Sequence, residues 1–496
     1  MIRSPSTNRD SYFLVSGNLA VALLGVLSQY LILVSLDTVE YGIWVLLLDA
    51  ALTIGTLTDF GIPDAMIRIW DGSRDGISRV VKKGLATQTL LASTIIILVT
   101  LTYPLEYFGN LDFSVVILMV SGSVLLFQLG SMRIGLRMYG RADEESLAML
   151  VDRILYIIAL LIAVRYGPTI ENFSKAFCCA ALTSFLYTAW RYYSNSSRNI
   201  SFYLSKDELS KKEIISMISL ASPFALSLFL FPLFGRIDKF IIAFFEGTIQ
   251  VGYFNIPWLV ILSGLAVPRS IRQAALPDLG SNKGSKERFS SIVDKSWNVS
   301  ALLIWVGVPA SIMLSNLVFE EVFPMRLVSP KDFDYSGVRL LICLLPAWVW
   351  AMIGSLELEV LKLEKSPFKY TLIISLALLI NFTFGILAIP RLGLLGASIS
   401  SAIGFFSLFV SSYVYGPFHG TNSKLIWKKT SVGVLYSILL LSMAINWNSG
   451  VIAESAFRAA MLTALFTLPL ALVTAPHVIR EILYQRKNRY LEADGK

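Results

Sequence analysis

Apolar runs of about 20 residues alternate with short polar stretches along the whole chain. A helix needs about 20 apolar residues to cross the roughly 30 Å of hydrocarbon in a bilayer, so each run predicts one membrane-spanning helix. Fourteen segments are predicted in this way: 12–35, 43–63, 85–103, 114–132, 147–164, 176–193, 220–245, 250–268, 297–318, 337–357, 368–388, 393–415, 431–447 and 459–476.

Composition agrees with this pattern and excludes other classes of protein. Of the 496 residues, 55% are hydrophobic and 15% are charged, and the mean hydropathy is +0.66. These values indicate an all-α polytopic membrane protein and exclude a soluble enzyme. Three cysteines in apolar runs and two histidines far apart in sequence form no metal or disulfide framework. We therefore expect no metal site and no cofactor.

Basic residues are distributed unevenly between the two sets of loops. If the N-terminus, every second loop and the C-terminus share one side, that side holds most of the 42 Lys and Arg residues. The positive-inside rule then places both termini in the cytoplasm, with the protein in the plasma (inner) membrane. The net charge of +8 therefore reflects topology, and no nucleic acid partner is expected. Met1–Asp10 lacks a cleavage signature after it, which predicts a retained first helix.

Two halves of the chain carry short motifs in a similar order. Asp37–Trp44 and Gly247–Tyr253 both combine Thr, an aliphatic residue and a polar residue with a following Gly and an aromatic residue. The motifs lie six helices apart, an even number, so the halves are predicted to run parallel about an axis along the membrane normal. The polar stretch Ser194–Glu213 is predicted to link them, and no soluble domain is expected.

Three charges interrupt the apolar segment 220–245. As a single helix of about 39 Å, this segment would place Arg236, Asp238 and Lys239 inside the outer half of the bilayer. Charges there are costly unless they face protein or water, which makes them functional candidates. Arg236 and Lys239 share a helix face, whereas Asp238 points elsewhere and needs a partner from another helix. The alternative ends the helix near Phe234 and leaves the charges in an exposed loop; the internal repeat favours burial.

Seven short motifs follow one another along the chain in a distinctive order and spacing. Through them the chain resembles polysaccharide flippases of the multidrug/oligosaccharidyl-lipid/polysaccharide exporter superfamily, close to O-antigen and lipopolysaccharide-type exporters, over nearly its whole length. The motifs are Tyr41–Trp44, Leu57–Pro63, Gly140–Arg141, Ser222–Pro223, Arg236–Lys239, Val251–Tyr253 and Gly393–Ala397.

The resemblance implies a fold and an activity. It implies two six-helix lobes around a central cavity, with two peripheral helices. The expected domains are an N-terminal lobe at 1–193, a cytoplasmic linker at 194–219, a C-terminal lobe at 220–416, and helices 13 and 14 with a cytoplasmic tail at 417–496. It also implies alternating access that carries a pyrophosphate-linked lipid oligosaccharide outward, without enzymatic activity. Membrane lipids and polymerase or glycosyltransferase enzymes of the same pathway are the expected partners.

Charged side chains are the first candidates for contact with such a cargo. Arg236 and Lys239 are suited to pyrophosphate, because the planar guanidinium fork binds phosphate oxygens in pairs. Arg68 is either a phosphate contact near the inward entrance or an anchor that obeys the positive-inside rule. Asp238 and Asp49 are the carboxylate candidates. Asp49 either pairs with Arg236 or Lys239 across the cavity, takes part in ion coupling, or forms a structural interhelical pair.

Asn255 is a candidate sugar contact, although polar residues in membranes also hold helices together.

Two other functions compete with the flippase hypothesis. A cation-coupled multidrug exporter of the same superfamily would prefer an excess of carboxylates in its cavity. A membrane glycan polymerase or glycosyltransferase would need an external catalytic loop or domain, and every predicted external connection is short.

Overall fold

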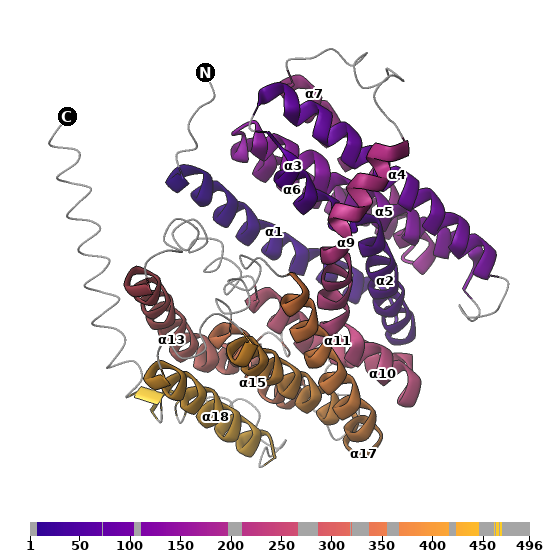
Figure 1. The fold of residues 1–496 in the computed structure, drawn as a ribbon. Coiled ribbons are helices and arrows are strands. Elements are labelled where there is room, and N and C mark those ends of the chain that lie inside the picture. The colour runs from indigo at the N-terminus through magenta and orange to yellow at the C-terminus, as the bar shows by residue number, and fades with distance from the viewer. Residues whose placement is uncertain are drawn as a thin grey trace, which may run out of the picture. The chain divides into compact units, whose positions relative to one another are not determined.

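The computed structural model is almost entirely helical in the residues that it describes (Figure 1). These are residues 7–71, 73–103, 111–196, 211–265, 286–317, 319, 337–354, 367–415, 423–445, 461, 463–465 and 467–468. By its contacts the chain separates into two compact units, Met1–Gly252 and Tyr253–Lys496. The predicted linker falls largely on residues 197–210, which lie outside the described residues.

The structure describes fourteen helices among these residues. In chain order they are α1 (Thr7–Ser35), α2 (Thr38–Asp59), α3 (Ile62–Ile69), α4 (Arg74–Thr102), α5 (Phe113–Met138), α6 (Ala142–Tyr166), α7 (Ile170–Asn195), α9 (Lys211–Phe234), α10 (Ile237–Phe245), α11 (Thr248–Gly264), α13 (Lys286–Leu317), α15 (Gly337–Ile353), α17 (Pro367–Tyr415) and α18 (Ser423–Ile445).

Many of these helices suit a bilayer. Among the described residues, seven helical stretches are long and apolar enough to cross a membrane, and a bent pair in α9 would make an eighth. Large apolar side chains lie on the outside of the helices, including Leu101, Leu186 and Phe244. The prediction of an all-α polytopic membrane protein is therefore confirmed. The last predicted segment, 459–476, lies mostly outside the described residues, so the count of fourteen stays a prediction.

The first unit is built around α5 and α7. These two helices pack along their length, α6 packs on α1 and α7, and α2 packs on α5. Small residues allow the close approach: a Cβ atom added at Gly122 would lie 2.7 Å from the ring of Phe177, and one at Gly135 would lie 2.6 Å from the ring of Tyr192. Packing of large side chains against glycine is a usual source of helix association in membranes.

The second unit centres on α15. This helix packs on α13, α17 and α18, and nearly all of its side chains are buried. The predicted segments 368–388 and 393–415 correspond to the two parts of α17, which are joined at Gly393 by non-helical backbone with φ of 55°. That left-handed conformation suits glycine, which lacks a Cβ atom.

Hydroxyl groups on the exposed part of α4 are satisfied within that helix. Thr89, Ser93, Thr94 and Thr100 lie on the exposed part of α4, and each donates a hydrogen bond to the carbonyl oxygen four residues earlier. A polar group that faces hydrocarbon without a partner would cost several kcal/mol. Back-bonding to the helix therefore lets α4 carry hydroxyl groups inside the membrane.

The α2–α3 span is interrupted where the sequence carries Asp59–Phe60–Gly61. Phe60 and Gly61 adopt left-handed backbone with φ of 48° and 75°, and Pro63 follows in the first turn of α3. This conformation ends α2 at Asp59, and the fixed φ of proline suits the start of a new helix.

The predicted single helix over 220–245 is wrong in one respect. The helix is broken at Gly235 and Arg236, so that α9 ends at Phe234 and α10 begins at Ile237. The apolar character of the sequence continues through the break, which is why hydropathy did not reveal it. The alternative is right that the helix ends at Phe234 but wrong that the charges form an exposed loop, because Asp238 and Lys239 are only 3% and 5% exposed.

The glycines of the two repeated motifs meet in the first unit. A Cβ atom at Gly42 on α2 would lie 1.9 Å from the carbonyl oxygen of Thr248 at the start of α11. A Cβ atom at Gly252 would lie 3.2 Å from the ring of Tyr41. The similar motifs therefore form one backbone-to-backbone contact between α2 and α11.

Substitution of Gly42 tests this contact. We expect Gly42→Ala to lower the free energy of unfolding by about 1–3 kcal/mol, because the new methyl group must push α11 away from α2. The measurement is thermal unfolding of purified protein in detergent. The control is Gly25→Ala on α1, where an added Cβ atom meets nothing within 4 Å and alanine favours the helix. Equal unfolding temperatures for the two variants would contradict the close contact.

Candidate functional site

A buried ion cluster joins α2 to α10. Asp49, in the middle of α2, places its Oδ2 atom 2.8 Å from Nζ of Lys239 and its Oδ1 atom 3.2 Å from Nε of Arg236. The two basic residues are three positions apart, so their side chains point to the same side at the start of α10. Of the alternatives for Asp49, the structure shows the contact with Arg236 and Lys239, and the functional role of that contact stays a prediction.

Thr53 completes the cluster, and the sequence analysis missed it. Its hydroxyl donates to the carbonyl oxygen of Asp49 at 2.6 Å and accepts from Nη1 of Arg236 at 3.0 Å. Thr53 follows Asp49 by four residues, so both side chains lie on the same face of α2. This spacing is the signal that could have identified it.

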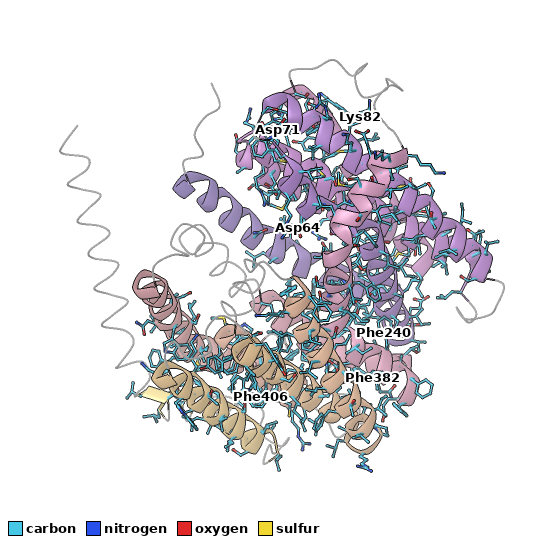
Figure 2. All side chains as sticks on the ribbon, viewed as in Figure 1. Asp64, Asp71, Lys82, Phe240, Phe382 and Phe406 are labelled. Carbon is cyan, nitrogen blue, oxygen red and sulfur yellow. The ribbon has the colours of Figure 1, made fainter. Side chains whose placement is uncertain are left out.

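The break between α9 and α10 positions the cations. Arg236 occupies the position just before α10, with φ of −125° and ψ of −16°. Arg236 therefore directly precedes the first turn of α10, and Lys239 lies in that turn. The N-terminal end of a helix is itself electropositive. Phe240, the neighbour of Lys239 in the chain, marks α10 among the side chains in Figure 2.

Burial differs among the charged groups of the cluster. The side chain of Lys239 is 6% exposed, that of Asp49 is 12% exposed and that of Arg236 is 19% exposed. Asp238 is also buried, on a neighbouring face of α10. The four ionised groups sum to zero charge, but the contact face has two cations against one carboxylate. Asp49 therefore contacts both cations of the cluster.

The other predicted site residues lie elsewhere. Arg68 is exposed in the last turn of α3, beyond the break that follows α2. It therefore does not belong to the Asp49 cluster. Asn255 is buried on the part of α11 that belongs to the second unit. In the described part of the chain, no group of three or more His, Cys, Asp or Glu side chains could hold a metal ion.

Comparison with solved structures identifies the fold. An outward-facing multidrug resistance MATE family transporter of the MOP superfamily aligns with a TM-score of 0.58 at 16% identity, over 90% of this chain and 98% of its own. A MOP superfamily transporter from Pyrococcus furiosus, described as having a binding pocket of reverse polarity, gives 0.58 at 16%, over 88% and 97%. A MATE protein in a bent conformation gives 0.56 at 17%, over 86% and 96%.

Comparison by sequence identifies the family. No curated protein matches the chain by sequence. The family model described as polysaccharide biosynthesis protein matches residues 8–277, which is more than half of the chain and includes the whole Asp49 cluster. The match and the shared fold agree with the resemblance stated from the motifs. The chain therefore belongs to the polysaccharide biosynthesis protein family, and its fold is similar to that of MATE transporters.

Proposed function

We propose that this transporter is a flippase for a lipid-linked oligosaccharide. The cargo is a glycan joined to a lipid through pyrophosphate, as in O-antigen synthesis, and it moves from the cytoplasmic to the outer leaflet by alternating access. The observation that carries the proposal is the pair Arg236 and Lys239, held on an apolar span against a single facing carboxylate. Membership of a polysaccharide biosynthesis family supports the same substrate class.

The chemistry of the cargo fits the cluster. A pyrophosphate group carries several anionic oxygens, and its interactions with cations strengthen as water is excluded. The guanidinium group of an arginine binds two such oxygens at once. Between transport events, the nearby carboxylate balances the positive charge of such a cation inside the membrane.

The two cations are proposed to have different roles. Lys239 is the more buried and has the shorter contact with Asp49, so its main role is to neutralise that carboxylate. Arg236 is the more exposed and lies farther from Asp49, with a neutral hydroxyl as its second partner. We therefore assign Arg236 to the pyrophosphate and Lys239 to holding α10 against α2.

Topology and partners follow from the same proposal. Both termini and the basic loops are assigned to the cytoplasmic side of the inner membrane, which is the side where the glycolipid is loaded. A polymerase or glycosyltransferase of the same pathway would consume or supply the glycan.

Multidrug export is the competing function, because solved multidrug transporters share this fold. An organic cation would be repelled by Arg236 and Lys239, and its binding would need a free carboxylate. Efflux of a fluorescent cation from proteoliposomes, without glycolipid transfer, would favour this rival.

Replacement of Arg236 tests the proposed site. We expect Arg236→Gln to reduce export about tenfold or more, because a charge-assisted contact to phosphate is worth about 1.5–3 kcal/mol. The measurement is the amount of lipid-linked glycan on each leaflet in cells that carry only the variant, with glycan accumulating on the cytoplasmic leaflet. The control, Lys175→Gln, removes an exposed cation that pairs with Glu171 on α7. Full export by Arg236→Gln at normal protein level would contradict the assignment.

Replacement of Asp49 tests the role of Lys239. We expect Asp49→Asn to lower the free energy of unfolding by about 3–5 kcal/mol, because two buried cations lose their carboxylate. The double variant Asp49→Asn/Lys239→Met should lose less than the sum of the single variants, with a coupling of about 0.5–3 kcal/mol.

The readout for this cycle is thermal unfolding in detergent. A parallel cycle on the exposed pair Glu171 and Lys175 should give a coupling of about 0–1 kcal/mol. Additive effects of the Asp49 and Lys239 substitutions would show that the pair does not hold α10 to α2.

A further inference from the structure

The hairpin of α5 and α6 contains a second group of charges within the first unit. Nη2 of Arg133 on α5 approaches Oδ2 of Asp152 on α6 to 3.5 Å, and the two side chains are 17% and 9% exposed. Arg153 follows Asp152 in the chain and is close enough to Arg133 to repel it. Two guanidinium groups therefore lie beside Asp152, and the other carboxylate that acts on Arg133 is Glu145, which is already paired with Arg137.

Several hydrogen-bond donors in this group have no partner. Among the described residues, Nε and Nη2 of Arg133, Nε of Arg153 and the hydroxyl of Tyr156 are buried and make no hydrogen bond. Arg153 directly follows Asp152 in the chain, and Tyr156 follows Arg153 by three residues and Asp152 by four. Their side chains therefore lie on neighbouring faces of α6. Tyr156 is fixed by an edge-to-face contact with Phe177 of α7 at 5.9 Å. Buried donors without acceptors are uncommon, and charged ones are the most costly.

The depth of the group shows that Arg133 is not a surface anchor. Arg133 lies five residues before the end of α5, and Asp152 lies ten residues after the start of α6. At 1.5 Å per residue, Asp152 is about 15 Å along α6 from the loop between the helices. The guanidinium of Arg133 thus extends along the helix away from the loop, whereas an anchoring arginine would reach toward it.

Two neighbouring arginines of the first unit each form a two-pronged pair with a glutamate. Arg137, one turn after Arg133, gives Nε to Oε2 of Glu145 at 2.7 Å and Nη2 to Oε1 of the same residue. Arg191 of α7 pairs in the same two-pronged way with Glu144. Carboxylates that match arginines are therefore available in this part of the unit. Around Arg133 and Arg153, Asp152 at 3.5 Å leaves guanidinium donors without a hydrogen bond, which marks an unfilled acceptor position.

We propose that Arg133, Arg153 and Tyr156 form a binding site for a phosphate group. A phosphate carries several oxygens and can accept from two guanidinium groups and a phenol together, and its charge offsets the excess of arginine. The phosphate is either a free ion or the headgroup phosphate of a membrane lipid, since the chemistry of recognition is the same. The inference concerns binding in the first unit and does not rest on the proposed cargo.

Thermal unfolding of the purified full chain tests this site. The probes are inorganic pyrophosphate in detergent, compared with sodium chloride of equal ionic strength, and nanodiscs of phosphatidylglycerol, compared with phosphatidylcholine. We expect at least one probe to raise the unfolding temperature of the unmodified protein. Arg133→Gln and Arg153→Gln should weaken the apparent affinity for that probe about tenfold or more.

Three further variants make the result specific. Arg137→Gln is the matched control one turn along α5, and it should retain the stabilisation because its donors serve Glu145. Arg236→Gln removes the proposed pyrophosphate contact of the Asp49 cluster, so any stabilisation that persists in this variant and is lost with Arg133→Gln comes from the Arg133 site. Arg133→Lys keeps the charge but loses the fork, so it should give intermediate affinity if Arg133→Gln fails to yield monodisperse protein.

The two probes distinguish the source of the phosphate. Stabilisation by pyrophosphate identifies a site for a free or flexible phosphate group, and stabilisation by phosphatidylglycerol alone identifies a lipid headgroup site. The inference is overturned if neither probe stabilises the protein, or if Arg133 and Arg153 variants respond as Arg137→Gln does.

Discussion

The contact between Asp49 and the cations of α10 is the interaction on which the account depends. In an apolar span a lone ion is too costly to persist, so each charge needs a partner or access to water. Asp49 supplies the partner for Lys239 and a weaker one for Arg236. The same contact ties the broken end of α9 and α10 to the middle of α2. In the proposed function, this one carboxylate both holds α10 against α2 and keeps Arg236 available for an anion.

Other polar groups obey the same constraint in different ways. Hydroxyl groups on α4 return to their own helix, and Thr53 uses its hydroxyl both for the helix and for Arg236. Near the loop between α5 and α6, arginines pair with Glu144 and Glu145. Arg133 and Arg153 depart from this pattern, since part of their donor capacity has no acceptor among the described residues. Other buried groups of the unit also lack a hydrogen bond, but Arg133 and Arg153 are charged donors gathered in one place, which is the reason to infer a ligand there.

The sequence predicted the helices well, because hydrocarbon thickness dictates the length of an apolar run. It also predicted that Arg236 and Lys239 are sheltered, and it included the correct partner, Asp49, among its alternatives. It did not predict the break at Gly235 and Arg236, since apolar residues continue on both sides of it. It missed Arg133 because the predicted segment 114–132 ended just before it, whereas α5 continues to Met138. Hydropathy does not specify the rotation of a helix, and that rotation decides whether such an arginine faces inward.

Equilibrium binding of a polyprenyl-pyrophosphate-linked oligosaccharide to the purified protein tests the central claim most directly. The claim is that sheltered positive charge selects a phosphate-bearing cargo. The account predicts saturable binding that is displaced by inorganic pyrophosphate and unaffected by tetraphenylphosphonium. Saturable binding of tetraphenylphosphonium, with no binding of the glycolipid, would contradict it.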